Sequence, residues 1–385
     1  MSEQDHNAPA RPVGAIEQWR ARSYHRAHRL LSVTGYLVDG ALLIALLFTG
    51  WSVALRNVAE SVRQEPALAL LIYALLLGAI MKALSLPFDY AGGFWLEHRY
   101  GLSNLTFAGW LKDEIKGVLV GGLLGILALE FLYWALRMWP HDWWLVTGAV
   151  FAAFFVVMAN LAPVLILPIF FKLVPLANPS LEARLRRLAE SAGTRVRGVY
   201  EWKLGEKTKK ANAALIGLGN TRRILLADTL LEGFSEDEIE AVLAHELGHH
   251  VHADIWRGLA VQTSATFLGL YLVSLALARW SGALGFRGPS DFANLPLVIL
   301  VTLVVSLLLL PAVNGFSRRM ERAADAYAVR SIAQPAVFVT GLERLASLNL
   351  AERRPHPLIE FVFHSHPSID SRIEYVRKFS ARPAA

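Results

Sequence analysis

Apolar residues occur in six long blocks along the chain, and polar segments separate the blocks. Most blocks come close to the roughly twenty residues with which an α-helix crosses a lipid bilayer. Charged side chains are rare in the blocks and gather between them. This pattern predicts a mainly α-helical, polytopic membrane protein with spans at residues 38–55, 67–84, 118–136, 143–165, 259–278 and 295–313.

The polar segment between the fourth and fifth blocks has the periodicities of a small folded unit. Residues 181–192 carry apolar side chains at helical spacing, and residues 196–202 alternate as a strand does. Residues 214–216 and 224–226 form two further short strands around a turn at residues 217–220. We therefore predict a soluble part with a small β-sheet beside the membrane helices.

The composition agrees with a membrane protein, because 54% of the residues are hydrophobic and only 18% are charged. The alternative is a large soluble protein with buried core helices. It fits less well because Trp residues cluster at block ends, as at Trp139, Trp143 and Trp144. Two acids, Asp39 and Glu130, lie inside blocks, where they either face an aqueous cavity or are hydrogen-bonded within the bundle.

The distribution of arginine predicts the orientation in the membrane. Five arginines lie ahead of the first block, and we expect residues 1–30 to form a cytoplasmic tail. Residues 85–116, 172–255 and 315–385 hold nearly all the remaining basic residues and are predicted on the same side. The formal net charge of +6 fits loops beside an anionic membrane surface, and no segment resembles a nucleic-acid-binding module.

The clearest chemical motif lies on a helix that a capping box and apolar spacing predict at residues 236–251. His245 and His249 are four residues apart and share one face of this helix, with Glu246 directly after the first imidazole. Two imidazoles at this spacing bind zinc in metallopeptidases, and the adjacent carboxylate moves protons. The alternative is a surface helix that carries these residues by chance.

A third metal ligand is expected on a second helix, because catalytic zinc sites take three protein ligands and leave one position open. The chain has no cysteine, which excludes thiolate ligands and cysteine-protease chemistry. Residues 317–328 are rich in helix formers. On them we predict Glu321 as the third ligand and Asp325 as the acceptor that orients a ligand imidazole. The alternative is a solvated helix whose acids pair with Arg318 and Arg322.

Further motifs accompany these two helices. They include Leu86-Pro87-Phe88-Asp89-Tyr90, Tyr100-Gly101-Leu102-Ser103, Pro163 to Pro168, Asn212 to Gly219, Asn314-Gly315-Phe316-Ser317-Arg318, and His366-Pro367 with Arg372. Together with the helical motifs, this set resembles the type I CAAX prenyl endopeptidases, a family of membrane zinc metallopeptidases related to the heat-shock protease HtpX. Eukaryotic members of the family have more spans ahead of the Leu86-Pro87 segment than the two predicted here.

The resemblance implies further site residues. The segment Asn212-Ala213-Ala214 would form an edge strand that pairs with extended substrate backbone. His366, delivered from outside the ligand helices, would stabilise the oxyanion with support from Arg372. Asn314 would stand beside the metal ligands. Without the resemblance, Asn212-Ala213-Ala214 would be interpreted as part of an ordinary hairpin and His366 as a loop residue.

We therefore expect a gluzincin-like domain at residues 172–385, interrupted by the last two spans, behind a membrane region of four spans at residues 31–171. The expected activity is peptide-bond hydrolysis by a zinc-activated water, with one Zn²⁺ per chain and Glu246 as base and then acid. The expected partners are the lipid bilayer and a peptide or protein substrate, for which lipidated and membrane-inserted forms are candidates and prenylation is not required. The Arg- and Ala-rich composition favours a bacterial inner membrane.

Two alternatives to this function remain open at the level of sequence. One is a quality-control protease that cuts misfolded membrane proteins, and the other is a non-catalytic membrane scaffold of the same fold. The intact set of His245, Glu246, His249 and Glu321 argues against a scaffold, which has no need of a complete ligand set.

Overall fold

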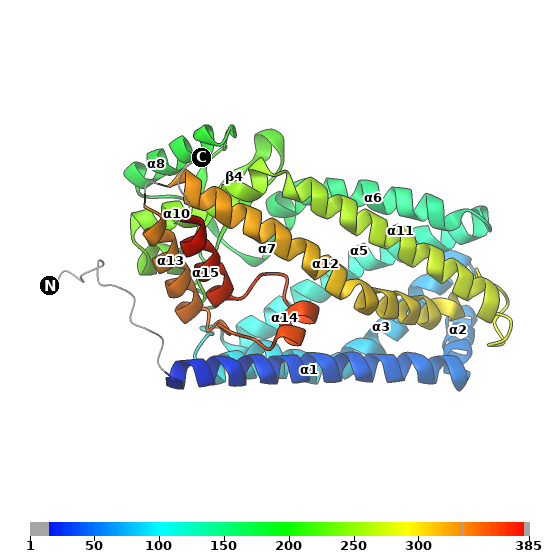
Figure 1. Cartoon of the computed structure of the whole chain (residues 1–385). Coiled ribbons are helices and arrows are strands. Elements are labelled where there is room, and N and C mark those ends of the chain that lie inside the picture. The colour runs from blue at the N-terminus through cyan, green and yellow to red at the C-terminus, as the bar shows by residue number, and fades with distance from the viewer. Residues whose placement is uncertain (1–14, 333, 381–385) are drawn as a thin grey trace.

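Six long helices form the membrane part of the protein, as seen in a computed structural model that describes residues 15–332 and 334–380. They run side by side along the length of the molecule (Figure 1), and all six belong to segments long and apolar enough to cross a membrane. The predicted polytopic helical fold is confirmed. The helices are α1 (Ala15–Phe48), α3 (Pro66–Tyr90), α5 (Phe107–Met138), α6 (Trp143–Leu161), α11 (Asp254–Trp280) and α12 (Leu295–Ser331).

The first span differs from its predicted bounds of residues 38–55. Helix α1 ends shortly before Gly50, and a separate short helix, α2 (Trp51–Val62), begins directly after it. Gly50 has a φ of 77°, a left-handed conformation that favours glycine, and apolar residues continue through this turn. Hydropathy therefore does not mark the break. At the other end, residues 15–30 of the predicted tail belong to α1, and residues 1–14 lie outside the described residues.

Two spans continue through a π-helical turn into a short final helix. Pro87 lies near the end of α3 and Pro163 follows α6. A proline has no N–H to donate within a helix, which favours such a local change of hydrogen bonding. The added elements are η1 (Ala91–Trp95) and α4 (Leu96–Arg99) after α3, and η2 (Ala162–Ile166) and α7 (Leu167–Phe170) after α6.

One of the two acids inside the spans lies at a cavity. Asp39 of α1 lines a cavity of about 410 Å³, together with Asp89 of α3 and Glu114 of α5. This arrangement favours the cavity alternative for Asp39. Glu130 of α5 is not among the residues described as lining that cavity.

A four-stranded sheet lies beside the end of the membrane helices. Its order is β1-β2-β4-β3, with β2 parallel to β4 and the other two pairs antiparallel. The strands are β1 (Leu173–Pro175), β2 (Val199–Trp202), β3 (Ala213–Ile216) and β4 (Arg223–Ala227). The three predicted strands are present with slightly different bounds. The sequence did not predict β1 because so short a strand has no recognisable alternation.

Helix α10 (Glu236–Val251) has the bounds that the sequence predicts. The hydroxyl of Ser235 accepts a hydrogen bond from the N–H of Glu238, and the carboxylate of Glu238 accepts one from the N–H of Ser235. These two bonds are the predicted capping box. They fix the start of the helix, and therefore which residues face its neighbours.

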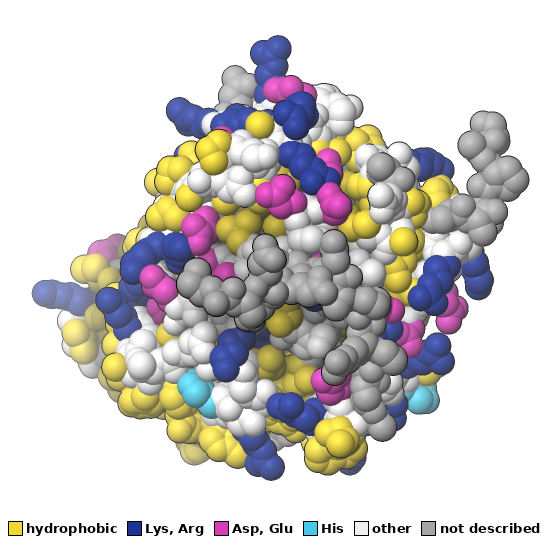
Figure 2. All heavy atoms as spheres, turned by 90° about the vertical axis from the view of Figure 1, so that its left-hand side faces the viewer, with side chains coloured by type: hydrophobic (Ala, Val, Ile, Leu, Met, Phe, Trp, Pro, Cys, Tyr) yellow, Lys and Arg dark blue, Asp and Glu magenta, His cyan; other side chains and the backbone are white. Residues whose placement is uncertain are grey.

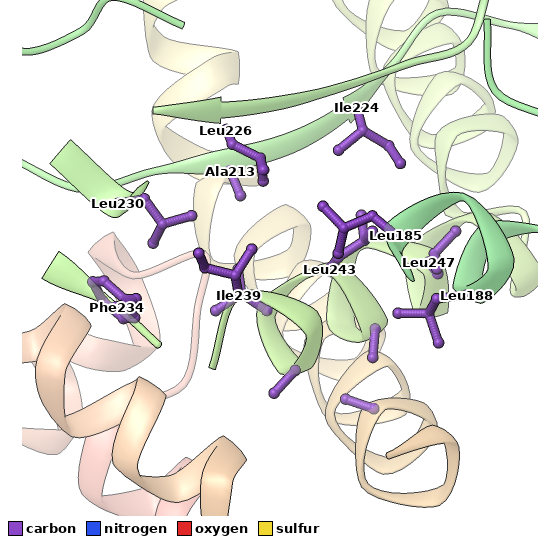
Figure 3. Packing of buried hydrophobic residues seen from close by; sticks show 14 of the residues in the cluster. Leu185, Leu188, Ala213, Ile224, Leu226, Leu230, Phe234, Ile239, Leu243 and Leu247 are labelled. Carbon is purple, nitrogen blue, oxygen red and sulfur yellow. The ribbon is translucent and has the colours of Figure 1, made fainter. Parts of the chain in front are cut away.

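The core of the soluble part lies between the sheet and α10. Ile239, Leu243 and Leu247 of α10 are buried in one apolar cluster with residues of the sheet and of α8 (Pro179–Ser191), as Figure 3 shows. The short helix α9 (Asp228–Gly233) adds to the same cluster. This packing holds α10 rigidly under the sheet, so that its opposite face is available for a site.

The C-terminal part of the chain returns toward the start of α1. A guanidinium nitrogen of Arg29 lies 2.8 Å from the carboxylate of Glu352, and the ring of His25 contacts the carbonyl of Leu350 at 3.0 Å. Figure 2 shows this end of the molecule, where Lys and Arg side chains are spread over the surface. The remaining elements are η3 (Gly219–Thr221), η4 (Phe292–Asn294), α13 (Pro335–Leu348), α14 (Pro357–Phe363) and α15 (Ile369–Ser380).

Candidate metal centre

Three predicted metal ligands come together where α10 faces α12. His245 and His249 present their Nε2 atoms to the two carboxylate oxygens of Glu321, at 3.4 Å and 3.3 Å. The three ligand atoms all lie within 4.8 Å of one another. The structure thus joins two segments of the chain that are more than seventy residues apart in the sequence.

The spacing of these donor atoms allows them to close around one metal ion. Ligand atoms about 2.0–2.2 Å from a tetrahedrally coordinated ion lie roughly 3.3–3.6 Å apart. Each imidazole Nε2 lies at such a distance from one of the two oxygens of Glu321. In addition, Oε2 of Glu321 is buried and has no hydrogen-bond partner among the described residues. A buried carboxylate oxygen without a donor is costly, and a cation between it and the imidazoles would satisfy it.

The close approach of α10 to α12 depends on Gly248. A Cβ atom at this position would lie 2.8 Å from the Cα of Ala324 and 3.0 Å from its carbonyl oxygen. Backbone atoms of a helix cannot move aside without shifting the whole helix. A glycine between the two ligand histidines therefore allows Glu321 to reach both imidazoles.

Asp325, predicted to orient a ligand imidazole, contacts the imidazole of His245. Its carboxylate lies 2.9 Å from Nδ1 of His245, and the residue is completely buried. Arg372 of α15 donates two hydrogen bonds to the same carboxylate, at 3.0 Å and 2.6 Å. An imidazole whose Nδ1–H is held by a carboxylate presents its Nε2 lone pair to the metal position. Arg372 thus acts on His245 through Asp325, although it also lines the cleft.

A second orienting carboxylate was not predicted. Asp254, the first residue of α11, lies 2.9 Å from Nδ1 of His249. Burial alone would lower the pKa of His249, but its hydrogen bonds to Glu321 and Asp254 raise that pKa to about 9. Ala253, with a φ of 56°, makes the turn that brings Asp254 back toward α10. The sequence feature that could have identified Asp254 is the presence of an acidic residue shortly after His249.

Glu246 and His366 face a common cleft of about 240 Å³. Burial raises the pKa of Glu246, although His245 and His249 act in the opposite direction. His366, from the segment between α14 and α15, lies 3.2 Å from Glu321 through its Nε2 atom. The predicted acid–base and oxyanion residues therefore stand on the side of the cleft next to the candidate metal position.

Asn314 contacts a different part of the protein from the metal ligands. Its side-chain N–H donates to the carbonyl of Val362 at 2.7 Å, and no contact with a candidate ligand is among its described hydrogen bonds. Arg318, one turn later, donates to the carbonyls of Glu360 and His364. Both residues fasten α14, which leads into the segment that carries His366. The sequence had suggested Arg318 only as an ion-pair partner for the acids of α12.

The predicted substrate-binding segment lies at the edge of the sheet. Strand β3 is one of the two outer strands, so one of its sides has no neighbouring strand among the described residues. Asn212 and Ala213 line the same cleft as Glu246, whereas Ala214 is not among the residues that line it. An open strand edge beside an acid–base residue can receive an extended peptide backbone.

Two family models together match nearly the whole chain. Residues 175–380 match peptidase family M48, and residues 12–172 match a model described as CAAX prenyl protease N-terminal, five membrane helices. Within the described part of the second range, four helical segments are long and apolar enough to span a membrane. Helix α2, with 12 residues, is shorter.

Several relatives are similar over most of their length. A Bacillus subtilis protein named as an uncharacterized metalloprotease, YhfN, is 29% identical over 94% of this chain and 86% of its own. CAAX prenyl protease 1 of Saccharomyces cerevisiae is 26% identical over 92% of this chain and 84% of its own. The crystal structure of S. mikatae Ste24p matches with a TM-score of 0.83 and 23% identity, covering 97% of this chain and 92% of that one.

Proposed function

Because this chain belongs to peptidase family M48, it is a membrane-embedded metalloendopeptidase, and we propose that its metal is one zinc ion held by His245, His249 and Glu321. The family resemblance drawn from the motifs is thereby confirmed. The observation that carries the proposal is the convergence of these three donors, one of which, His245, lines the same cleft as Glu246. Two imidazoles and one carboxylate with an open fourth position are the donor set of catalytic zinc sites.

The residues around the ligands have separable roles in this proposal. A zinc ion held by His245, His249 and Glu321 would supply a Lewis acid for the scissile carbonyl and for water. Glu246 takes the proton of the attacking water and delivers it to the leaving amine nitrogen, a task for which its raised pKa is suited. His366 donates a hydrogen bond to the developing oxyanion. Asp325 and Asp254 keep the two ligand imidazoles in the tautomer with Nε2 free.

The proposed substrate is a membrane-inserted or lipidated peptide. Relatives named as CAAX prenyl proteases support a lipidated substrate, and the position of α10, which carries Glu246, near the end of the long helices supports delivery from the bilayer (Figure 1). Strand β3 would hold the substrate backbone.

We divide the chain into a tail at residues 1–30, a membrane region at residues 31–171 and a peptidase domain at residues 172–385.

The proposed location is a bacterial inner membrane, with the active site in the cytoplasm. The similarity to a Bacillus subtilis protein and the basic surface at the peptidase end support this placement (Figure 2). Reporter fusions at Asn57, His141 and Gly285 should then report the outside, and fusions at Ser180 and at the C-terminus the inside. A reporter that placed Ser180 outside would reverse the orientation.

The direct test is a map of cleavage sites made with purified protein. Farnesylated and unmodified forms of the same peptides should both be incubated with the protein, with and without a strong chelator. The proposal predicts cleavage that the chelator abolishes and that added zinc restores, and faster cleavage of the farnesylated forms. Activity that survives chelation would contradict a metal mechanism. Equal rates for the two forms would leave the peptidase intact but remove the preference for lipidated substrates.

A further inference from the structure

The backbone groups of β3 alternate between its neighbour β4 and the open edge. The carbonyl of Asn212 accepts a hydrogen bond from the N–H of Ala227, directly before the antiparallel pair Ala213 and Leu226. In an antiparallel ladder, each residue directs both its N–H and its C=O to one side, and the next residue directs them to the other. Asn212 therefore faces β4, and so does Ala214.

The residues that face the open edge are consequently Ala211, Ala213 and Leu215. The side chain of Ala213 points into the core below the sheet, as Figure 3 shows. Its N–H and C=O are thus the part of this residue that a bound peptide can reach. Of the three residues predicted to bind substrate, only Ala213 offers these groups to a new strand.

The outward groups of Ala211 are already taken. The side-chain carbonyl of Asn349 accepts a hydrogen bond from the N–H of Ala211 at 2.8 Å, and its side-chain N–H donates to the C=O of Ala211 at 3.1 Å. One amide side chain thereby makes both bonds that a neighbouring strand would make at this position. Asn349 stands at the C-terminal end of α13, where its own N–H donates to the carbonyl of Leu345.

This arrangement lies at the catalytic end of the edge strand. Ala211, Ala213 and Asn349 line the same cleft as Glu246, and Leu215 lies farther along the strand. We propose that Asn349 is a positioning residue that ends the substrate-binding edge at Ala211, so that a peptide strand pairs with Ala213 and Leu215 only. The proposal rests on the function proposed above, in which β3 receives the substrate.

The consequence is a peptide-binding edge that ends before Ala211. A substrate gains backbone hydrogen bonds where it runs along Ala213 and Leu215. It gains none where it passes Ala211, because Asn349 occupies that place. Lengthening a peptide at the end that passes Ala211 should therefore leave the KM of the wild-type protein unchanged, whatever residues are added.

The test is a series of peptides with one cleavage site, each extended by two residues at one end or at the other. For wild-type protein, the KM should fall when the peptide is extended at the end that runs along Ala213 and Leu215. It should not change when the peptide is extended at the second end, which passes Ala211. In Asn349→Ala, the freed N–H and C=O of Ala211 should lower the KM of the peptide extended at that second end by about tenfold relative to the shorter peptide. Asn349→Ser has a shorter side chain that cannot make both bonds to Ala211, so we expect a smaller decrease of about threefold.

The ratio of the two KM values separates positioning from a merely structural role. A structural defect would change the kinetics of short and extended peptides alike, and would leave this ratio at its wild-type value. Asn104→Ala, which removes one side-chain bond to the carbonyl of Gly205, is the matched control and should also leave the ratio unchanged. Asn349→Ser keeps the experiment decisive if Asn349→Ala does not fold.

Two outcomes would overturn the inference while peptidase activity remained intact. One is a wild-type protein whose KM falls with extension at both ends. The other is an Asn349→Ala variant whose KM stays indifferent to extension at the second end. A wild-type protein without any hydrolysis of these peptides would instead contradict the proposed function itself.

Discussion

The two halves of α12 follow opposite rules of burial, although they form one continuous helix. In the first half, Leu308 exposes 74% of its surface, and several neighbouring apolar side chains are also exposed. In the second half, Glu321 and Asp325 are buried, and Asp325 exposes none of its surface. A helix of a soluble protein would bury its apolar side chains and expose its charged ones. The first half of α12 therefore suits a lipid environment, and the second half suits a polar site enclosed by protein.

This difference in burial indicates which residues of α12 tolerate substitution. An exposed Leu costs little in a bilayer, because acyl chains are as apolar as its side chain. A buried carboxylate is costly unless a charge or hydrogen-bond donor compensates it. Asp325 therefore depends on His245 and Arg372, and Glu321 on the two imidazoles and a metal ion. Changes in the second half should have far larger consequences than changes in the first.

The largest effect is expected from Glu321→Ala, which removes the carboxylate that contacts both imidazoles. Two ligands do not hold a catalytic zinc ion firmly, so both metal and peptide hydrolysis should be lost. Elemental analysis and a peptide assay measure the two effects. Arg322→Ala, on the exposed side of the same helix, is the control and should keep its zinc. Full zinc occupancy in the Glu321 variant would mean that another residue is the third ligand.

A matched pair of leucines tests the contrast in burial directly. Leu243 of α10 is completely buried in the core of the soluble part, whereas Leu308 of α12 exposes 74% of its surface in a segment long and apolar enough to cross a membrane. Leu243→Ala should lower the free energy of unfolding by about 2–5 kcal/mol, because it leaves a cavity. Leu308→Ala should change it by less than about 0.5 kcal/mol. Thermal unfolding in lipid compares them, and equal losses would refute the assignment of the first half of α12 to lipid.

A smaller effect is expected from Asp254→Asn, which removes the charge that orients His249. Loss of such a carboxylate behind a ligand histidine lowers metal affinity by about 10–100-fold. Competition with a chelator of known affinity measures the change. Asp237→Asn, an exposed acid near the start of α10, is the control. An unchanged affinity would show that α11 has no influence on the metal site.

The last effect concerns pH. Zinc binds the neutral imidazole, and in the metal-free protein the pKa of His249 is raised to about 9. Below that pH the ring carries one proton that zinc must displace, so the apparent affinity should fall by up to about tenfold per pH unit as the pH is lowered from 9. A zinc affinity that did not change between pH 7 and pH 9 would contradict this protonation.

The parts of the site that were predictable from sequence lie within single helices. The capping box at Ser235 fixed the start of α10, and helical spacing then put His245 and His249 on one face. Glu321 and Asp325 followed from the same argument on α12. Both helices form from local interactions, so a motif on them keeps its geometry whatever the rest of the chain does.

The parts that escaped prediction depend on turns and on contacts between distant segments. Asp254 reaches His249 only because Ala253 takes a left-handed conformation, which no periodicity reports. Asn349 forms its hydrogen bond with Ala211 across a sequence separation of 138 residues. The break at Gly50 divides α1 from α2 within an apolar run, where hydropathy has no contrast. Tertiary packing decides all three.

The central claim is that three residues hold the metal while Glu246 transfers protons without binding it. Zinc content and peptide hydrolysis measured on the same preparation of Glu246→Gln test this most directly. Glutamine keeps the shape of the side chain and cannot take up a proton at neutral pH. We expect about one zinc per chain in this variant and hydrolysis reduced by at least about a hundredfold. A variant that hydrolyses peptides at the wild-type rate, or one that has lost its zinc, would contradict it.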